Sequence, residues 1–372
     1  MTKIGILGGG QLGMMIAEEG LRLGIAMAIL GDSAVAPASR FFGYQHGLLT
    51  TENVRQFVQS VDIVTFEFEN IPIAVLDLLE EEFADKCRPN ISAIRIFQDR
   101  LLEKEFLECC GIPVAPYKAI NNVAEIREFI LNGDTKQGAI VKTRRSGYDG
   151  KGQIRISAED LILDHSKITD QCTTLLQNSP CIIEKIVSFD EELSVIAGCS
   201  LDNPPVQYPL IKNYHQDGIL RESCPDCSLE QYVPQAKEII AKIAKSLNYI
   251  GVLTVEFFLT SSGLIANEVA PRVHNSGHWT IEGAHTSQFN QAVRAAAGLP
   301  LGSPEIIGYP WMGNIIGSAP SKSKILSIPK TVLHLYGKEP RSARKLGHVT
   351  AVSSTLDERE LIRNKVLSIL NN

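Results

Sequence analysis

Side chains able to bind anions or transfer protons are concentrated in residues 267–280 of this 372-residue chain. The segment carries one carboxylate, one guanidinium, two imidazoles and two side-chain amides, interrupted by one proline and one glycine. It directly follows the apolar run 264–266, and a segment this polar is a poor continuation of a core strand. We therefore expect a loop at the rim of a sheet, where a rigid scaffold holds binding and catalytic residues.

Two carboxylates, Glu256 and Glu268, fall within a predicted hairpin made of the apolar runs 251–259 and 264–267. If residues 261–263 form a three-residue loop with Gly263 in the left-handed conformation, Glu256 faces Glu268 across the two strands. Directly opposed residues have Cβ atoms about 5 Å apart. Two carboxylates at that distance repel each other by about 3 kcal/mol at an effective dielectric constant near 20, so a cation is expected between them.

Magnesium suits this pair because it takes oxygen ligands and is bound by one or two carboxylates together with substrate phosphates and water. Asn267 could add an amide oxygen or position a metal-bound water. Phe257 and Phe258 adjoin Glu256, so an unpaired ionised carboxylate there would be costly. In the alternative interpretation the register slips by one residue, and one carboxylate faces solvent.

Two glycine-rich segments are candidates for binding phosphate through backbone N–H groups. Residues 8–13 read Gly-Gly-Gly-Gln-Leu-Gly between a predicted strand at 3–7 and a helical pattern, with Asp32 after the next strand, as in dinucleotide-binding folds. Residues 143–153 hold three glycines and three cations, a composition able to fold over a polyphosphate. The simpler interpretations are a tight turn for the first segment and a mobile hairpin with solvated charges for the second.

A third candidate anion site is the segment 337–348, where residues 338–345 include four cations in a chain whose net charge is −6. A local basic loop in an acidic protein suggests a site for one anion, and a solvated basic turn is the simpler interpretation. The same net charge argues against a broad nucleic-acid-binding surface. Cys224 and Cys227 have metal-ligand spacing, but without a second pair a surface turn is preferred to a zinc site.

The elements that must position these residues alternate between strands and helices, which predicts an α/β protein of two or three units. Residues 67–70 follow a predicted strand at 62–66, at the strand end where open α/β sheets place ligand loops. A single helix is expected at 92–110, and a polar loop at 213–219. No apolar run approaches the roughly 18 residues needed to span a bilayer, and no signal peptide is evident, so a cytoplasmic protein is expected.

Taken together, these residues resemble the ATP-grasp superfamily, and within it the N5-carboxyaminoimidazole ribonucleotide synthetases of purine biosynthesis. The resemblance covers the whole chain, and it is carried by residues 8–13, 66–72, Asp99-Arg100 with Lys104, 147–153, 215–221 and 272–279. It implies an α/β ATP-grasp architecture with a Rossmann-like N-terminal domain at 1–110, a central two-sheet ATP-grasp domain at 111–298 and a small β-rich C-terminal domain at 299–372. It also implies a homodimer.

The activity that this resemblance implies is that of an ATP-dependent carbon–nitrogen ligase, which uses MgATP to join bicarbonate to the exocyclic amine of 5-aminoimidazole ribonucleotide. ATP would lie between the two sheets, with Arg100 and Lys142 at its phosphates, residues 184–187 at the adenine edge and Glu192 at the ribose. Glu256 and Glu268 would hold magnesium, in agreement with the hairpin. The full set of implied ATP contacts is Arg100, Lys142, Gly147, Tyr148, Asp149, Gly150, Lys151, Gly152, Gln153, Glu184, Lys185, Ile186, Val187, Glu192, His215, Asn267 and Glu268.

The resemblance assigns the bicarbonate to Arg272, His274 and Asn275, with Arg272 as its bidentate partner. Bicarbonate would attack the γ-phosphate to form carboxyphosphate, and the substrate amine would then trap this intermediate or carbon dioxide released from it. Water would hydrolyse carboxyphosphate, so the glycine-rich loop at 143–153 is the expected lid.

The ribonucleotide substrate is implied to bind through its 5′-phosphate to Lys338 and Arg344, with Tyr148 and Asp149 near its imidazole. Here the chain departs from the family. The usual Arg-Pro-Gly-Arg of this loop is replaced by Arg-Ser-Ala-Arg at residues 341–344, which keeps the cations but changes the turns available to the backbone.

Three other functions compete with this interpretation. A dehydrogenase would use only residues 1–32 and would leave the carboxylate pair and both basic loops without a role. Another ATP-grasp ligase, such as a formate-using glycinamide ribonucleotide transformylase, is disfavoured by the string at 272–279. A non-catalytic nucleotide-binding subunit would lack Arg272 or the carboxylate pair, and this chain has both.

Overall fold

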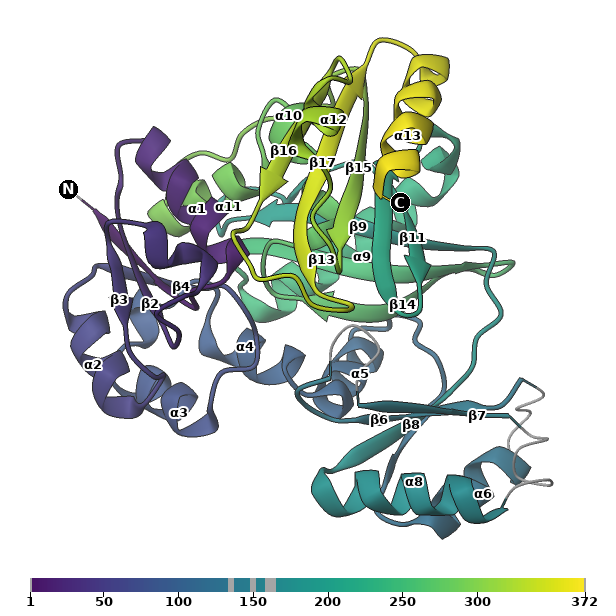
Figure 1. Cartoon of the computed structure of the whole chain (residues 1–372). Coiled ribbons are helices and arrows are strands. Elements are labelled where there is room, and N and C mark those ends of the chain that lie inside the picture. The colour runs from purple at the N-terminus through teal and green to yellow at the C-terminus, as the bar shows by residue number, and fades with distance from the viewer. Residues whose placement is uncertain (1, 133–136, 148–151, 158–164, 371–372) are drawn as a thin grey trace.

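The computed structural model describes residues 2–132, 137–147, 152–157 and 165–370 (Figure 1). These residues form three sheets: a four-stranded parallel sheet near the N-terminus, a small four-stranded antiparallel sheet, and a large nine-stranded sheet. Within the described ranges no helix is both long and apolar enough to cross a membrane. The α/β architecture expected from the sequence is confirmed.

The N-terminal sheet has the strand order β3-β2-β1-β4 with all neighbours parallel, so helices must carry the chain back between its strands. The strands at 3–7, 26–31 and 63–66 are near-continuous apolar runs, as expected where a sheet is covered on both faces, whereas the edge strand at 44–46 is polar and partly exposed. The elements are β1 (Lys3–Leu7), α1 (Gln11–Arg22), β2 (Ala26–Gly31), η1 (Pro37–Arg40), β3 (Tyr44–His46), α2 (Thr51–Gln59), β4 (Ile63–Phe66), α3 (Ile73–Glu82), η2 (Ala84–Lys86) and α4 (Ile91–Phe97).

The single helix predicted at 92–110 is wrong, because the chain forms α4 and then a separate α5 (Arg100–Cys109). Between them Asp99 is extended, and its carboxylate accepts a hydrogen bond from the N–H of Leu101. Aspartate is favoured as an N-cap because its side chain satisfies an N–H group that the helix cannot. The same carboxylate binds two arginines of the glycine-rich loop, and this long-range interaction has no signature in the helical periodicity.

The small antiparallel sheet has the order β5-β8-β6-β7, and two helices cover its outer face (Figure 1). Residues that alternate along its strands separate an apolar face, including Val141 and Ile183, from a face that carries Lys142 and Glu184. The polar face is directed away from the helices. The elements are β5 (Tyr117–Ile120), α6 (Val123–Asn132), β6 (Ala139–Thr143), β7 (Gln153–Ile156), α8 (His165–Asn178) and β8 (Cys181–Lys185).

The large sheet has the order β14-β13-β9-β11-β12-β15-β17-β16, with β10 paired to β9. Its C-terminal strands join through the β12–β15 pair, so they extend this sheet instead of forming one of their own. Its strands are β9 (Glu191–Cys199), β10 (Val206–Gln207), β11 (Ile211–Gln216), β12 (Ile219–Pro225), β13 (Gly251–Thr260), β14 (Gly263–Ala270), β15 (Tyr309–Ile316), β16 (Thr331–Leu335) and β17 (Lys345–Ser353). Its helices are η3 (Cys227–Tyr232), α9 (Val233–Leu247), η4 (Asn275–Gly277), α10 (Thr280–Gly283), α11 (Gln288–Ala297), α12 (Lys322–Leu326) and α13 (Leu356–Leu370).

The polar loop predicted at 213–219 is also wrong, because most of it is strand. β11 and β12 form a hairpin whose turn residues, Asp217 and Gly218, both have positive φ angles of 55° and 74°. An Asp-Gly pair is the favoured sequence for a two-residue turn of this kind. His215 therefore lies on a strand of the large sheet, where its neighbours fix its position.

Candidate functional site

The carboxylate pair lies where the sequence predicted it, but the hairpin reaches that register differently. Glu256 is paired with Glu268 across β13 and β14. The turn has two residues instead of three, because Thr260 already pairs with Gly263, and a β-bulge follows between Glu256 and Phe257. The bulge adds one residue to β14 and restores the register that the three-residue loop would have given. The polar segment also remains in β14 as far as Ala270, so the strand does not end at residue 267 as expected.

Two adjacent residues of α5 hold this bulge in place. The ammonium of Lys104, only 1 % exposed, donates to the carbonyl oxygen of Asn267 at 2.9 Å. The carboxyl of Glu103 accepts a hydrogen bond from the N–H of Val269. Burial, together with the nearby Glu268, raises the pKa of Glu103 to about 8, so this group is neutral at pH 7 and does not add a third charge.

Polar side chains from four neighbouring strands share one face of the large sheet, and we call them the polar row: Asn213 and His215 of β11, Glu192 and Ser194 of β9, Glu256 of β13, and Glu268 of β14. The pairings of Asn213 with Glu192, Ser194 with Glu256 and Glu256 with Glu268 establish this common face. In the row, His215 Nδ1 lies 2.6 Å from Glu192 Oε2. Burial alone would lower the pKa of His215, but Glu192 and Glu256 raise it.

The donor set of the row fits a magnesium ion. Burial, and after it the repulsion by Glu268 and Glu192, raises the pKa of Glu256 to about 7 although His215 opposes the shift, so a cation is needed to keep this carboxylate ionised. Among the residues that the structure describes, no group of three or more His, Cys, Asp and Glu side chains could hold a metal. Two carboxylates suffice for magnesium when phosphate and water oxygens complete its shell.

The small sheet carries a buried ion pair among the residues expected to contact ATP. Lys142 Nζ lies 2.9 Å from Glu184 Oε2, and Lys104 Nζ lies 3.8 Å from the same oxygen. Burial would raise the pKa of Glu184, but the two ammonium groups lower it to about 2. Its other carboxylate oxygen is buried without a partner among the described residues. The backbone N–H groups of Lys185 and Ile186 already donate to the carbonyls of Pro116 and Gly138.

The base of the glycine-rich loop is fixed to α5. Arg100 donates to the carbonyl oxygens of Thr143 and Gly147 at 3.0 and 2.9 Å. Asp99 accepts two hydrogen bonds from Arg144 and one from Arg145. Four of the predicted contacts, Tyr148, Asp149, Gly150 and Lys151, lie outside the described residues, whereas Gly152 and Gln153 lie at the start of β7.

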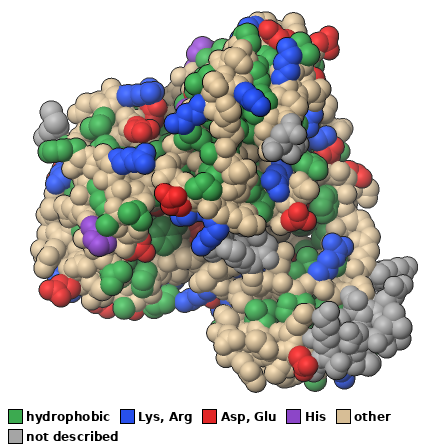
Figure 2. All heavy atoms as spheres, in the orientation of Figure 1, with side chains coloured by type: hydrophobic (Ala, Val, Ile, Leu, Met, Phe, Trp, Pro, Cys, Tyr) green, Lys and Arg blue, Asp and Glu red, His purple; other side chains and the backbone are tan. Residues whose placement is uncertain are grey.

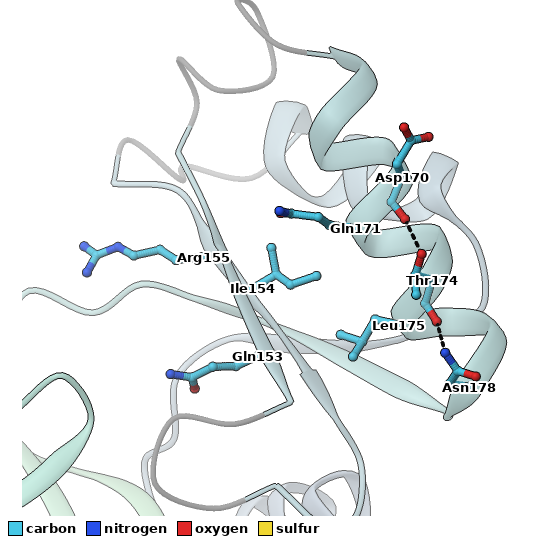
Figure 3. A pocket seen from close by; sticks show the side chains of 8 residues that line it. All are labelled: Gln153, Ile154, Arg155, Asp170, Gln171, Thr174, Leu175 and Asn178. Atoms are coloured by element: carbon cyan, nitrogen blue, oxygen red, sulfur yellow. Dashed lines mark hydrogen bonds between the residues drawn. The ribbon is translucent and has the colours of Figure 1, made fainter. Parts of the chain in front are cut away.

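An open groove of about 650 Å³ lies between β7 and α8 (Figure 3). Ile154 and Leu175 lie at its centre, and the side chains of Gln153 and Arg155 point away from α8. None of the polar-row residues lines this groove. On α8, Thr174 donates to the carbonyl of Asp170 and Asn178 donates to the carbonyl of Thr174. The groove therefore lies apart from the polar row, and Gln153 is the one implied ATP contact among the residues that line it.

Arg272, the predicted anion partner, is paired with a carboxylate of the loop that follows β4 in the N-terminal sheet. Its Nε and NH2 atoms donate to the two oxygens of Glu69 at 2.5 and 3.2 Å. Burial disfavours both charges, but each partner stabilises the other, so the pKa of Glu69 is lowered and that of Arg272 is raised. Sequence reasoning placed residue 69 at a ligand-binding strand end but did not assign it this role.

The glycine segment at 8–13 binds a carboxylate of the protein itself. Glu67 accepts hydrogen bonds from the N–H groups of Gly10 and Leu12 at 2.5 and 3.3 Å. A Cβ atom on Gly10 would lie 1.9 Å from a Glu67 oxygen. The N–H groups that would contact a dinucleotide phosphate are therefore already used, which rules out the dehydrogenase interpretation.

The loop after β14 places the other two predicted bicarbonate ligands. His274 Nε2 lies 3.5 Å from Glu256 Oε1 at the edge of the polar row. Burial, and then the neighbouring Arg272, lowers the pKa of His274 well below its usual value. The side-chain amide of Asn275 forms two hydrogen bonds with that of Asn314, at 2.7 and 3.0 Å. Asn314 Nδ2 also donates to the carbonyl of Leu220 at 2.9 Å, so the second N–H of the Asn275 amide is the one that these bonds leave for other contacts.

The basic tail loop contains an alanine in the left-handed conformation, which favours glycine. Ala343 has a φ angle of 61° in a turn closed by a 3.0 Å hydrogen bond from the N–H of Arg344 to the carbonyl of Arg341. The Arg344 guanidinium lies 3.3 Å from the carbonyl of Glu339, and Lys338 Nζ lies 5.7 Å from the Tyr336 ring. On the face drawn in Figure 2, basic and acidic side chains are interspersed over the surface. The loop is thus the local concentration of positive charge that the sequence indicated.

Models of three protein families match consecutive parts of the chain. The ribonucleotide synthetase preATP-grasp domain matches residues 1–98, the ATP-grasp domain matches residues 105–289, and the phosphoribosylaminoimidazole carboxylase C-terminal domain matches residues 311–361. The three matched ranges include the polar row, the glycine-rich loop and the basic tail loop.

Similar proteins cover almost the whole chain. N5-carboxyaminoimidazole ribonucleotide synthases of Pseudomonas aeruginosa and Brucella melitensis are 38 % and 39 % identical to it; each alignment covers 94 % of this chain, and 94 % and 96 % of the respective relatives. The crystal structure of the Thermus thermophilus synthetase superposes with a TM-score of 0.89 at 36 % identity, covering 99 % of both chains. That of the Aspergillus clavatus synthase, in complex with ADP and 5-aminoimidazole ribonucleotide, has a TM-score of 0.88 at 30 % identity and covers 100 % of this chain and 99 % of the other.

We expect Ala343→Gly to stabilise the protein by about 1 kcal/mol, because a left-handed conformation costs a non-glycine residue about 1–2 kcal/mol and the added backbone freedom of glycine in the unfolded chain offsets part of the gain. Urea unfolding measures the change. Ala297→Gly, a helical position in α11, serves as the matched control and should destabilise. A loss of stability in Ala343→Gly would show that the left-handed conformation of Ala343 does not strain the backbone.

Lys104→Met should destabilise the protein by about 1–3 kcal/mol, because the buried carbonyl of Asn267 loses its charged donor. Urea unfolding again provides the measurement. The control is Lys242→Met on α9, where an exposed lysine pairs with Glu238 and removal should cost less than about 0.5 kcal/mol. Equal effects of the two substitutions would show that Lys104 does not hold the bulge.

Proposed function

Because the chain belongs to the N5-carboxyaminoimidazole ribonucleotide synthase family, we propose that the polar row and the loop after it form the site where ATP, bicarbonate and 5-aminoimidazole ribonucleotide meet. The chain is an ATP-dependent carbon–nitrogen ligase of purine biosynthesis. The observation that carries the site assignment is the pairing of Glu256 with Glu268 beside His274. These residues combine a place for a nucleotide-bound cation with donors for an anion.

ATP is assigned to the space between the small and large sheets. Arg100 and Lys142 would neutralise its phosphates, residues 184–187 would follow the adenine edge, and Glu192 and His215 would lie toward the ribose. The family resemblance supports this assignment, as do the polar faces of the two sheets, with Lys142 and Glu184 on the small sheet and Glu192 and His215 on the large one. Glu256 and Glu268 would hold magnesium, with Asn267 beside them, and the ion would supply the positive charge that phosphoryl transfer requires.

Bicarbonate is assigned to Arg272 and His274, with Asn275 beside them. The chemistry requires positive charge here, which Arg272 would supply, because an anion must attack an anionic phosphate in line. A bicarbonate oxygen forms the new bond to the γ-phosphorus, the bond to the ADP oxygen breaks, and carboxyphosphate results. The substrate amine then bonds to the carboxyl carbon, phosphate leaves with the bonding electrons, and the amine loses a proton.

The ribonucleotide is assigned to the tail loop, where Lys338 and Arg344 would bind its 5′-phosphate. Tyr148 and Asp149, implied to lie near its imidazole, are outside the described residues. We also propose the homodimer and the domain boundaries at residues 110 and 298, which rest on the family resemblance.

Purified protein with MgATP and bicarbonate should release ADP slowly, and 5-aminoimidazole ribonucleotide should stimulate the release strongly, with one carboxylated product per ADP. Glu268→Gln should reduce this stimulated rate at least a hundredfold, because one of the two metal carboxylates is lost. Glu238→Gln, an exposed position on α9, is the matched control. Absence of stimulation in the unmodified protein would contradict the function, and full activity of Glu268→Gln would contradict the metal assignment.

Metal binding should weaken as the pH falls through 7, because the cation must displace the proton from Glu256, whose pKa is raised to about 7. This carboxyl is mainly ionised at pH 8 and about one-tenth ionised at pH 6, so the apparent Mn²⁺ dissociation constant of the ADP complex should rise about tenfold. Electron paramagnetic resonance measures free Mn²⁺, and parallel titration of ADP alone corrects for protonation of the nucleotide. A corrected constant that is the same at both pH values would refute the assignment.

A further inference from the structure

Both main-chain polar groups of His274 are hydrogen-bonded to the side chain of one residue, Gln288. Its backbone N–H donates to Gln288 Oε1 at 2.9 Å, and its carbonyl accepts from Gln288 Nε2 at 2.7 Å. Gln288 is fully buried. The main chain of His274 is therefore fixed, and the imidazole can vary only by its side-chain torsions and by the ring nitrogen that carries the proton.

The Nδ1 atom of His274 must be a hydrogen-bond acceptor. The backbone N–H of Ser276 points to it at 3.3 Å, and this group can only donate. The hydroxyl oxygen of Ser276 lies 2.9 Å from the same nitrogen. With Nδ1 unprotonated, the proton of a neutral imidazole resides on Nε2, the atom that faces Glu256 at 3.5 Å.

A buried chain of hydrogen bonds continues from this serine. Ser194 Oγ donates to Ser276 Oγ at 2.8 Å, and Asn213 Nδ2 donates to Ser194 Oγ at 2.9 Å. Both serines are fully buried and Asn213 is 5 % exposed, so water does not compete for these groups. Ser194 Oγ accepts from Asn213, and Ser276 Oγ accepts from Ser194. Each hydroxyl therefore donates its own hydrogen to the next group, and the last hydrogen, that of Ser276, points to His274 Nδ1.

Ser276 is secured independently of its hydroxyl. Its carbonyl oxygen accepts a hydrogen bond from Ser223 Oγ at 3.0 Å. Ser276 is also part of η4, the short helix that begins at the residue after His274. Ser194 is directly opposite Glu256 in the pairing of β9 with β13. The hydrogen-bonded residues Ser194 and Asn213 therefore lie on the same face of the sheet as the candidate metal ligands.

We propose that Ser276, supported by Ser194 and Asn213, is a positioning residue that fixes His274 as the Nε2–H tautomer, which makes this histidine a hydrogen-bond donor to the anionic oxygens of bicarbonate and carboxyphosphate. In this form Nε2 has no lone pair and does not act as a base. The role rests on the proposed function, since it names what the histidine does in that site. Donors held in place toward developing oxyanions need no rearrangement at the moment of reaction.

The tautomer is measured directly by two-bond ¹H–¹⁵N correlation spectra of protein labelled in its histidines, with His274→Gln used to assign the signal. We expect an unprotonated Nδ1 and a protonated Nε2 in the unmodified protein. This measurement requires no substrate, so its result is separate from the outcome of the ADP-release assay. A protonated Nδ1 would overturn the proposal even if the protein proves to be an active synthase.

Two substitutions test the chain. Ser276→Ala removes the hydroxyl donor, and Asn213→Asp is isosteric but can only accept, so it should reverse the direction of donation through Ser194. The backbone N–H of Ser276 remains in both variants, but at 3.3 Å it is the longer of the two contacts to Nδ1 and is expected to be too weak to fix the tautomer without the hydroxyl. Each variant should therefore give a mixture of His274 tautomers and lower kcat roughly five- to tenfold, the fold-change that corresponds to one lost hydrogen bond. The KM for ATP should remain within about twofold for Ser276→Ala, because Ser276 lies outside the polar row and is not assigned to the nucleotide.

Asn203→Asp, an exposed position between β9 and β10, is the matched control for the added charge. It should change neither the tautomer nor kcat. If Ser276→Ala and Asn213→Asp retain a single Nε2–H tautomer and the unmodified kcat, the proposal is wrong. If kcat falls while the tautomer is unchanged, the chain is merely structural and the proposal is equally refuted.

Discussion

The repulsion between two carboxylates held side by side in a partly buried place is the constraint around which the site is built. Glu256 and Glu268 oppose each other at the end of a hairpin, and their repulsion is about 3 kcal/mol at an effective dielectric constant near 20. The surroundings reduce this cost without cancelling it. Lys104 sits behind the bulge, Glu103 is neutral, and His215 lies in the same row. The repulsion that remains would favour a cation between the two carboxylates, as the proposed magnesium site requires.

The other buried charges of the site form ion pairs, each with a partner of opposite charge from a distant part of the sequence. Arg272 is paired with Glu69 of the loop after β4, and Lys142 with Glu184 inside the small sheet. A buried charge without a partner would cost several kcal/mol, and these pairs avoid that cost before any substrate is bound. In the proposed site they would also hold the cations in place before an anionic substrate binds, which is the preorganisation that electrostatic catalysis requires.

The glycine segment at 8–13 has the local structure of a phosphate-binding loop, but its N–H groups bind a carboxylate of the protein. The strand, the turn and the N-terminus of α1 all form as the fingerprint predicts. The carboxylate of Glu67 then occupies the N–H groups. A helix N-terminus favours any anion, so the motif by itself identifies a charge and not a ligand. Here the hydrogen bonds of Glu67 connect the loop after β4 to the start of α1. The same loop carries Glu69, which is paired with Arg272.

The sequence by itself determined the features that depend on neighbouring residues. These are the α/β class, the apolar strands, the facing of Glu256 and Glu268, and the basic tail loop, because periodicity and turn composition act over a few residues. The tertiary structure decided what depends on contacts between distant segments. Asp99 interrupts the helix predicted at 92–110 because arginines 45 and 46 positions later bind it. The bulge that corrects the hairpin register is held by a lysine 163 positions away. The bond from Ser194 to Ser276 spans 82 positions. Hydrogen bonds and ion pairs of this range leave no periodic trace in a sequence, and they set the final geometry of the site.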